Sequence, residues 1–212
     1  MDKTTALKIY KSLDSKIRNA VTELKYSSVF ELLIAVILSA QCTDKQVNKV
    51  TEKLFKLYNT PQDFARLNNS ELEKLVYSTG FYKNKAKNII LASNQIINSF
   101  NGEVPDNLSD LMMLAGVGKK TANVILSAGF NKPAIAVDTH VFRVSNRTGL
   151  IKAKNVKLAE QQLEELFDKK YYTKLHNLLV LHGRYVCTAK KPKCNECVIN
   201  RYCKYYKENE TK

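Results

Sequence analysis

Four cysteines near the C-terminal end of the sequence can bind an inorganic centre. Cys187, Cys194, Cys197 and Cys203 have the spacing Cys-x6-Cys-x2-Cys-x5-Cys. Thiolates are soft ligands, which favour iron–sulfur clusters and zinc. Only two residues separate Cys194 from Cys197, so a tight turn can direct both sulfurs at the same point. The spacing alone leaves a 4Fe–4S cluster and a structural zinc ion open as alternatives.

A second segment suited to chemistry is 111–124, where a Gly-Val-Gly turn separates two short helical stretches. Gly116 and Gly118 permit a sharp reversal and the close approach of a phosphate. Val117 can point inward and hold the two helices together. The free N–H groups at the start of the second helix can then bind an anion, and such contacts hold a nucleic-acid backbone without reading its sequence. An ordinary hairpin with glycines for close packing is the alternative.

Two residues are candidates for covalent chemistry. Lys120 follows the turn directly, where its amine could attack a sugar carbon of an extruded nucleotide. A phosphate contact or a solvated surface position are the other roles open to a lysine there. Asp138 precedes a helical stretch and is typical of an N-cap, although its carboxylate can also face a cleft beside Lys120. The sequence does not settle the role of His140.

Helices must position these residues, because helical signals recur along the chain while period-two alternation is scarce. Thr43 with Gln46 and Ser70 with Glu73 have the spacing of capping boxes, and Gly80 is placed to end the second helix. The apolar run 30–40 predicts a buried core helix. Further helices are expected over 84–100, 108–114, 121–128, 141–148, 156–167 and 174–187. The sequence therefore predicts an all-α fold.

The composition is that of a basic globular protein. The 212 residues have a formal net charge of +14, which suggests a polyanionic partner such as nucleic acid. A lysine-rich surface that serves only solvation is the alternative. The N-terminus does not resemble a signal peptide, and the run 30–40 is far shorter than the ~20 residues of a membrane span. We expect no membrane association and a reducing cytoplasm.

Together these motifs resemble the endonuclease III family of the helix-hairpin-helix DNA glycosylase superfamily. The resemblance covers nearly the whole chain and rests on 38–44, 80–86, 116–122, 137–140 and the four cysteines, in that order. It implies two helical lobes flanking a DNA-binding cleft. One lobe would be 22–132, with the helix-hairpin-helix, and the other 1–21 with 133–212, with the iron–sulfur cluster. The cysteine array is then implied to hold a 4Fe–4S cluster.

The resemblance also implies roles for single residues. Lys120 falls on the family's nucleophile and Asp138 on its catalytic aspartate. Gln41 falls where a side chain fills the space left by the extruded base. Phe81 falls at the wedge position, where the family often has leucine. Ala115 stands where many relatives have proline, so a slightly less rigid turn is expected.

Further DNA contacts are implied at two places. The turn Gly116, Val117 and Gly118 would grip one phosphate. The loop between the first two cysteines carries three lysines, of which Lys191 is expected to contact DNA, and the cluster would fix this loop against phosphate. A solvated loop is the alternative.

The implied function is that of a bifunctional DNA glycosylase and AP lyase of base excision repair. Such an enzyme would remove oxidised pyrimidines through a lysine Schiff base and cut the strand by β-elimination. Its partner would be double-stranded DNA with damaged pyrimidines or abasic sites. We expect a monomer that acts in the cytoplasm with the chromosome.

Two other kinds of protein share some of these motifs. Adenine-type monofunctional glycosylases look similar, but they usually lack a lysine at the position of Lys120 and carry a catalytic glutamate where this sequence has Ala35. They also have an extra C-terminal domain, for which the residues after Cys203 leave no room. A non-catalytic helix-hairpin-helix DNA-binding protein with a structural metal site is the second alternative, against which the co-occurrence of Lys120 and Asp138 argues.

Overall fold

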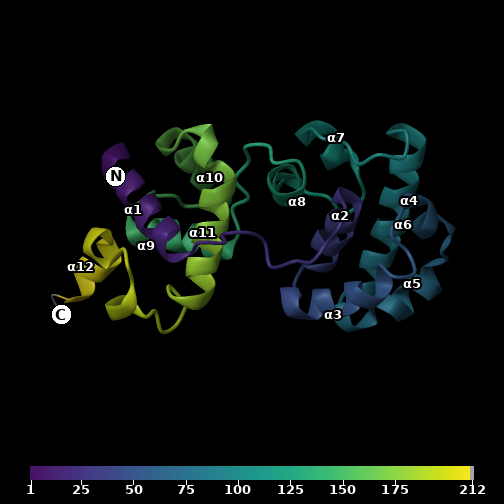
Figure 1. Ribbon diagram of the computed structural model, residues 1–212, viewed down its shortest axis with the longest axis horizontal. Coiled ribbons are helices and arrows are strands. Elements are labelled where there is room, and N and C mark those ends of the chain that lie inside the picture. The colour runs from purple at the N-terminus through teal and green to yellow at the C-terminus, as the bar shows by residue number, and fades with distance from the viewer. Residues whose placement is uncertain (211–212) are drawn as a thin grey trace. The chain divides into compact units, whose positions relative to one another are not determined.

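The computed structural model describes residues 1–210, and all regular elements in this range are helical (Figure 1). No strand occurs among these residues, so the all-α prediction is confirmed. The chain divides into two compact units, one formed by 1–22 and 132–212 and the other by 23–131. Within residues 1–210, no helix combines the length and the apolar character that crossing a membrane requires.

The unit 23–131 is organised around α2 (Val29–Leu38), which packs against α3, α6, α8 and η2. As the apolar run predicts, α2 is a core helix, buried from Phe30 to Leu38. Its one carboxylate, Glu31, is buried too, and it accepts hydrogen bonds from the backbone N–H and the hydroxyl of Ser27 at 2.6 and 2.7 Å. These bonds compensate the desolvation of the charge. The other elements are α3 (Asp44–Leu54), α4 (Pro61–Arg66), α5 (Asn69–Val76), η1 (Tyr77–Thr79), α6 (Tyr82–Ser99), α7 (Leu108–Met113), α8 (Lys119–Val124) and η2 (Ile125–Gly129).

The two predicted capping boxes need correction. In α5 the box is formed by Asn68 and Glu71, two residues earlier than the predicted Ser70 and Glu73. Both pairs have the required spacing, but the hydroxyl of Ser70 donates instead to Asn68 Oδ1 at 2.7 Å. The asparagine is therefore the cap, and Ser70 supports it.

At α3 only half of the predicted box forms. Thr43 accepts from the backbone N–H of Gln46 at 3.3 Å, as an N-cap does. The Gln46 side chain does not complete the box, because its amide donates to the hydroxyl of Ser78 at 2.7 Å. Gln46 thus connects α3 to η1. Gly80 ends η1 at φ +68°, in agreement with its predicted capping role.

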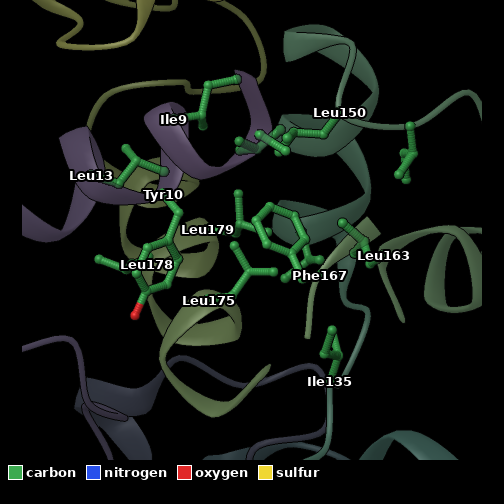
Figure 2. Close-up of a cluster of buried hydrophobic side chains, with 14 of the residues drawn as sticks. Ile9, Tyr10, Leu13, Ile135, Leu150, Leu163, Phe167, Leu175, Leu178 and Leu179 are labelled. Carbon is green, nitrogen blue, oxygen red and sulfur yellow. The ribbon is translucent and has the colours of Figure 1, made fainter. Parts of the chain in front are cut away.

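The other unit has its own core between α1 (Lys3–Lys16) and α11 (Tyr172–Tyr185) (Figure 2). Ile9 and Leu13 from α1 are fully buried with Leu175 and Leu178 from α11. The helix α9 (Thr139–Thr148) packs against α11 and α12. The remaining elements are α10 (Val156–Leu166), η3 (Lys169–Tyr171), η4 (Cys194–Glu196), η5 (Asn200–Tyr202) and α12 (Lys204–Glu210).

Candidate functional site

The hairpin 108–124 has the expected helix-turn-helix form, and its glycines play different parts. Gly116 has φ +78°, and a Cβ there would lie 2.9 Å from the Cβ of Asn88, so both conformation and space require glycine. Gly118 has φ −90°, and nothing lies within 4 Å of the position a Cβ would take. Val117 is buried between them, as predicted. The turn is therefore closed at Gly116, where Asn88 fills the space, and open at Gly118, where no protein atom lies nearby.

The turn is also held from outside by Gln95 of α6, which was not predicted from the sequence. The side-chain oxygen of Gln95 accepts from the backbone N–H of Ala115 at 2.8 Å, and its amide donates to the carbonyl of Met113 at 2.9 Å. Proline at position 115 would have no N–H to donate. We expected a slightly less rigid turn at Ala115. The bond from its N–H to Gln95 stabilises the turn, and proline could not make this bond.

Lys120 is the second residue of α8, and its side chain is exposed. The second hairpin helix begins at Lys119, two residues before the predicted start, which places Lys120 in the first turn beside Gly118. Asp138 is the N-cap of α9, as predicted, and its carboxylate accepts from the backbone N–H of Val141 at 2.7 Å. Lys120 belongs to the unit 23–131 and Asp138 to the other unit, so their meeting in one site stays a prediction.

Gln41 and Phe81 share an unusual backbone conformation. Their φ angles are +54° and +50°, in the left-handed region that side chains other than glycine seldom adopt. Each such residue costs of the order of 1–3 kcal/mol, and such strain clusters at functional sites. Both side chains are exposed, and 62% of the Phe81 surface is accessible. An exposed aromatic ring on a strained turn is a feature that packing does not explain.

The four cysteines line one cavity, with about 340 Å³ of space that protein atoms do not occupy, part of it open to solvent. All four are free thiols. Thiolates are the usual protein ligands of an iron–sulfur cluster, so four thiols around a common space suit such a group.

Two arginines of α9, neither of them predicted from the sequence, hold the loop after Cys187. Arg147 donates to the carbonyls of Thr188 and Ala189, each at 2.7 Å, and its Nη1 lies 3.8 Å from Cys187 Sγ. Arg143 donates to the carbonyls of Cys187 at 3.1 Å and Gly183 at 2.8 Å. The signal was present as two arginines four residues apart, which lie on one face of a helix.

Burial changes the pKa values of the thiols and of a histidine beside them. Burial raises the pKa of the Cys197 thiol to about 11, and it raises the pKa values of Cys194 and Cys203 above their usual value. A metal must therefore displace these protons on binding. His182 Nε2 lies 3.5 Å from Cys197 Sγ, and burial lowers the pKa of His182 to about 4, so this imidazole is neutral at pH 7.

His140 has a place in this region. Its Nδ1 lies 3.1 Å from Arg143 Nη2, and its Cβ lies 2.9 Å from where a Cβ on Gly183 would be. It therefore packs against α11 at Gly183, where the absence of a side chain lets α9 approach closely. The loop lysines, including Lys191, are exposed, and the Lys191 carbonyl accepts from the hydroxyl of Thr188 at 2.7 Å.

Comparison with known proteins agrees with this arrangement. Residues 34–169 match the profile of the HhH-GPD superfamily base excision DNA repair proteins, and residues 187–203 match the iron–sulfur binding domain of endonuclease III. The chain is 47% identical over 210 residues to endonuclease III of Haemophilus influenzae, which covers 99% of this chain and 100% of that protein. It is 44% identical over 205 residues to endonuclease III of Escherichia coli strain K12, which covers 97% of each.

A similar fold is found in a solved structure of a trapped endonuclease III–DNA covalent intermediate, an estranged-adenine complex. The TM-score is 0.94 at 41% identity, and the match covers 99% of both chains.

These findings confirm the resemblance drawn from the sequence motifs. The protein is a DNA N-glycosylase and AP lyase, and its cofactor is a 4Fe–4S cluster rather than zinc. The chain belongs to the endonuclease III family, within the HhH-GPD superfamily of base excision DNA repair proteins.

Proposed function

We propose that this enzyme removes oxidised pyrimidines from duplex DNA, with Lys120 as the nucleophile and Asp138 as its carboxylate partner. The observation that carries the proposal is the position of Lys120, an exposed amine in the first turn of α8 directly after an open glycine turn. An amine in that position can reach the sugar of the nucleotide whose phosphate the turn binds.

DNA binding begins with charge. The net charge of +14 attracts the duplex, and the phosphate contacts release counterions. The open side of the turn at Gly118 suits a phosphate, which the N–H groups at the start of α8 would bind. Lys191, exposed on the cysteine loop, supplies a further phosphate contact. Solved structures of similar fold are endonuclease III–DNA complexes, which supports this assignment.

The damaged base is then extruded at a cost of a few kcal/mol, which is lower for a poorly stacked lesion. Phe81 acts as the wedge, and Gln41 fills the space that the base leaves. The exposed side chains of both residues, on turns of strained backbone, are consistent with these roles. A phenyl ring at the wedge position can stack between bases, as the leucine that the family often has there cannot.

The chemical steps follow from a neutral amine. The Lys120 nitrogen bonds to C1′ of the deoxyribose while the glycosidic C–N bond breaks and the base departs with the electron pair. Asp138 accepts the amine proton or stabilises the positive charge that builds on the sugar. The C1′–O4′ bond then breaks and the ring oxygen takes up a proton, which leaves a Schiff base. Removal of a proton from C2′ then expels the 3′ phosphate, as the 3′ C–O bond breaks by β-elimination.

Cys187, Cys194, Cys197 and Cys203 are the proposed ligands of the cluster, because all four line one cavity. These four cysteines would hold the cluster, and their attachment to one centre would order the basic loop 187–194. We assign it no step in the bond chemistry.

The adenine-type alternative is disfavoured by Ala35. This residue occupies the expected glutamate position, and it is fully buried in α2. Its methyl side chain cannot take the role of a catalytic carboxylate.

Borohydride trapping tests the proposal. Reduction in the presence of an abasic-site duplex should give a covalent protein–DNA adduct with the native enzyme and none with Lys120→Gln. The matched control is Lys157→Gln, because Lys157 is also exposed and also the second residue of its helix, α10. Absence of the adduct from the native enzyme, or its persistence in Lys120→Gln, would refute the assignment of the nucleophile.

The lesion class and the state of the protein need separate tests. A panel of duplexes with single lesions should show turnover of oxidised pyrimidines and little of mispaired adenine. We further propose that the enzyme acts as a monomer in the cytoplasm with the chromosome. Sedimentation of the holoenzyme with a single-lesion duplex should give a complex of one protein with one duplex, and a second protein copy would contradict this.

A further inference from the structure

Lys85 is a buried lysine that the proposed chemistry does not use. It lies in the first turns of α6 with 4% of its surface accessible, although lysine is among the residues least often buried. Burial also lowers its pKa. Its ammonium donates to the carbonyl of Leu38 and to the carbonyl of Thr79, both at 2.8 Å. These two acceptors are far apart in sequence, so one nitrogen links two separate segments.

Both acceptors end a helix. Leu38 is the last residue of α2 and Thr79 the last residue of η1. Carbonyls at the end of a helix lack a partner within it, and a positive charge is favourable there. Lys85 therefore caps both helix ends at once and holds them at a fixed separation.

Each of these helix ends leads directly into a strained, exposed residue. Gln41 follows Leu38 by three residues, and Phe81 follows Thr79 by two. The backbone N–H of Lys85 also donates to the carbonyl of Phe81 at 3.1 Å. Lys85, which joins the two helix ends through its side chain, thus contacts Phe81 through its backbone as well.

A second bond joins the same two segments. The side-chain amide of Gln46, in the first turn of α3 after the Gln41 turn, donates to the hydroxyl of Ser78 at 2.7 Å. Ser78 lies in η1, before the Phe81 turn. Two side chains therefore connect the segment around Gln41 and the segment before Phe81. Lys85 does so in the interior, and Gln46 does so near the surface.

We propose that Lys85, with Gln46 as a second tie, is a positioning residue that sets the separation of Gln41 and Phe81, so that both enter the duplex together. This inference rests on the proposed function, which gives these two side chains their roles at the lesion. Extrusion of a base requires the wedge and the gap-filling side chain to act on the same base pair. Two turns that moved independently would seldom present both side chains at the required separation.

The test uses a duplex with thymine glycol opposite 2-aminopurine, whose fluorescence rises when it loses stacking. Lys85→Met keeps the length and apolar stem of the side chain but donates no hydrogen bond. Compared with the native enzyme, we expect it to slow both the fluorescence rise and single-turnover base removal by roughly tenfold to a hundredfold, since small displacements near reacting groups have effects of that size. Lys74→Met, which removes the same charge from an exposed position on α5, should leave both rates unchanged.

A double-mutant cycle separates positioning from general stability. In a Gln41→Ala, Phe81→Ala background there is nothing left for Lys85 to position, so Lys85→Met should change the residual rates by less than about twofold. An equal slowing in both backgrounds, or no slowing in the native background, would overturn the inference. If Lys85→Met does not fold, Gln46→Ala replaces it in the same cycle with the same criteria, because that bond lies at the surface.

Trapping distinguishes this failure from failure of the proposed function. If the native enzyme gives no borohydride adduct with abasic DNA, the proposed function fails and the inference with it. If the native enzyme gives the adduct but Lys85→Met flips the base at the native rate, only the inference fails.

Discussion

The side-chain oxygen of Gln95 lies 2.8 Å from the backbone nitrogen of Ala115, so helix α6 holds the turn of the hairpin directly. The amide of the same side chain donates to Met113, which closes a bridge across the end of α7. The bond to Gln95 uses the backbone N–H of Ala115, which proline would lack. The hairpin of this enzyme is thus supported by a side chain outside it.

Loss of this bridge should loosen the hairpin. We expect Gln95→Met to lower the free energy of unfolding by roughly 0.5–1.5 kcal/mol, because two partly exposed hydrogen bonds are lost. Hydrogen exchange of the Ala115 amide should accelerate in the same variant. Unchanged exchange at Ala115 would show that the bridge does not form in solution.

The two glycines of the turn should respond differently to alanine. Gly116→Ala should destabilise the protein by roughly 1–3 kcal/mol, because the left-handed backbone disfavours a Cβ and Asn88 lies in its way. Gly118→Ala should unfold at the native temperature but bind duplex DNA more weakly, since its added methyl group faces open space where the phosphate is proposed to bind. Thermal unfolding and duplex affinity measure the two effects. Native affinity in Gly118→Ala would place the phosphate elsewhere.

Asp138→Asn offers a clean test of the carboxylate, because asparagine caps a helix as well as aspartate does. The bond to Val141 should persist, so thermal stability and duplex affinity should change little. Turnover should fall by roughly 10²–10⁴-fold if the carboxylate takes part in proton transfer. A variant with native turnover would leave Asp138 with its capping role alone.

Arg147→Lys should make the cluster labile. Lysine cannot reproduce the planar fork that donates to Thr188 and Ala189, so the loop after Cys187 loses its fixed position. We expect the visible absorbance of the iron–sulfur centre to decay several-fold faster in air than in the native protein. Arg66→Lys, at an exposed site at the end of α4, is the control. Equal decay in all three proteins would mean that the clamp does not protect the cluster.

Lys191 can be tested through salt. Log affinity for duplex DNA should fall linearly with log salt concentration, and Lys191→Ala should reduce that slope by about one if its ammonium contacts a phosphate. Lys157→Ala, which removes a lysine from α10, should keep the native slope. A native slope in Lys191→Ala would show that this lysine contacts no phosphate and is only a solvated residue of its loop.

The sequence predicted the features that local chemistry determines. The cap at Asp138, the glycine turn and the cysteine spacing each depend on neighbours within a few residues. The long-range ties were missed: Lys85 to Leu38, Gln95 to Ala115 and Arg147 to Thr188. A lysine, a glutamine or an arginine carries no mark of its distant partner, because the packing of helices brings the two together. The capping box of α5 failed for a different reason, since two overlapping pairs satisfied the same pattern and only the structure shows that Asn68 is the cap.

The helix α9 connects the cysteine loop to Asp138. Asp138 caps its first turn, and Arg147 grips the cysteine loop nine residues later, about 14 Å further along the axis. The carboxylate and the hold on the cysteine loop are thereby fixed to the two ends of a single helix. A substitution that shifted this helix would therefore disturb both ends together.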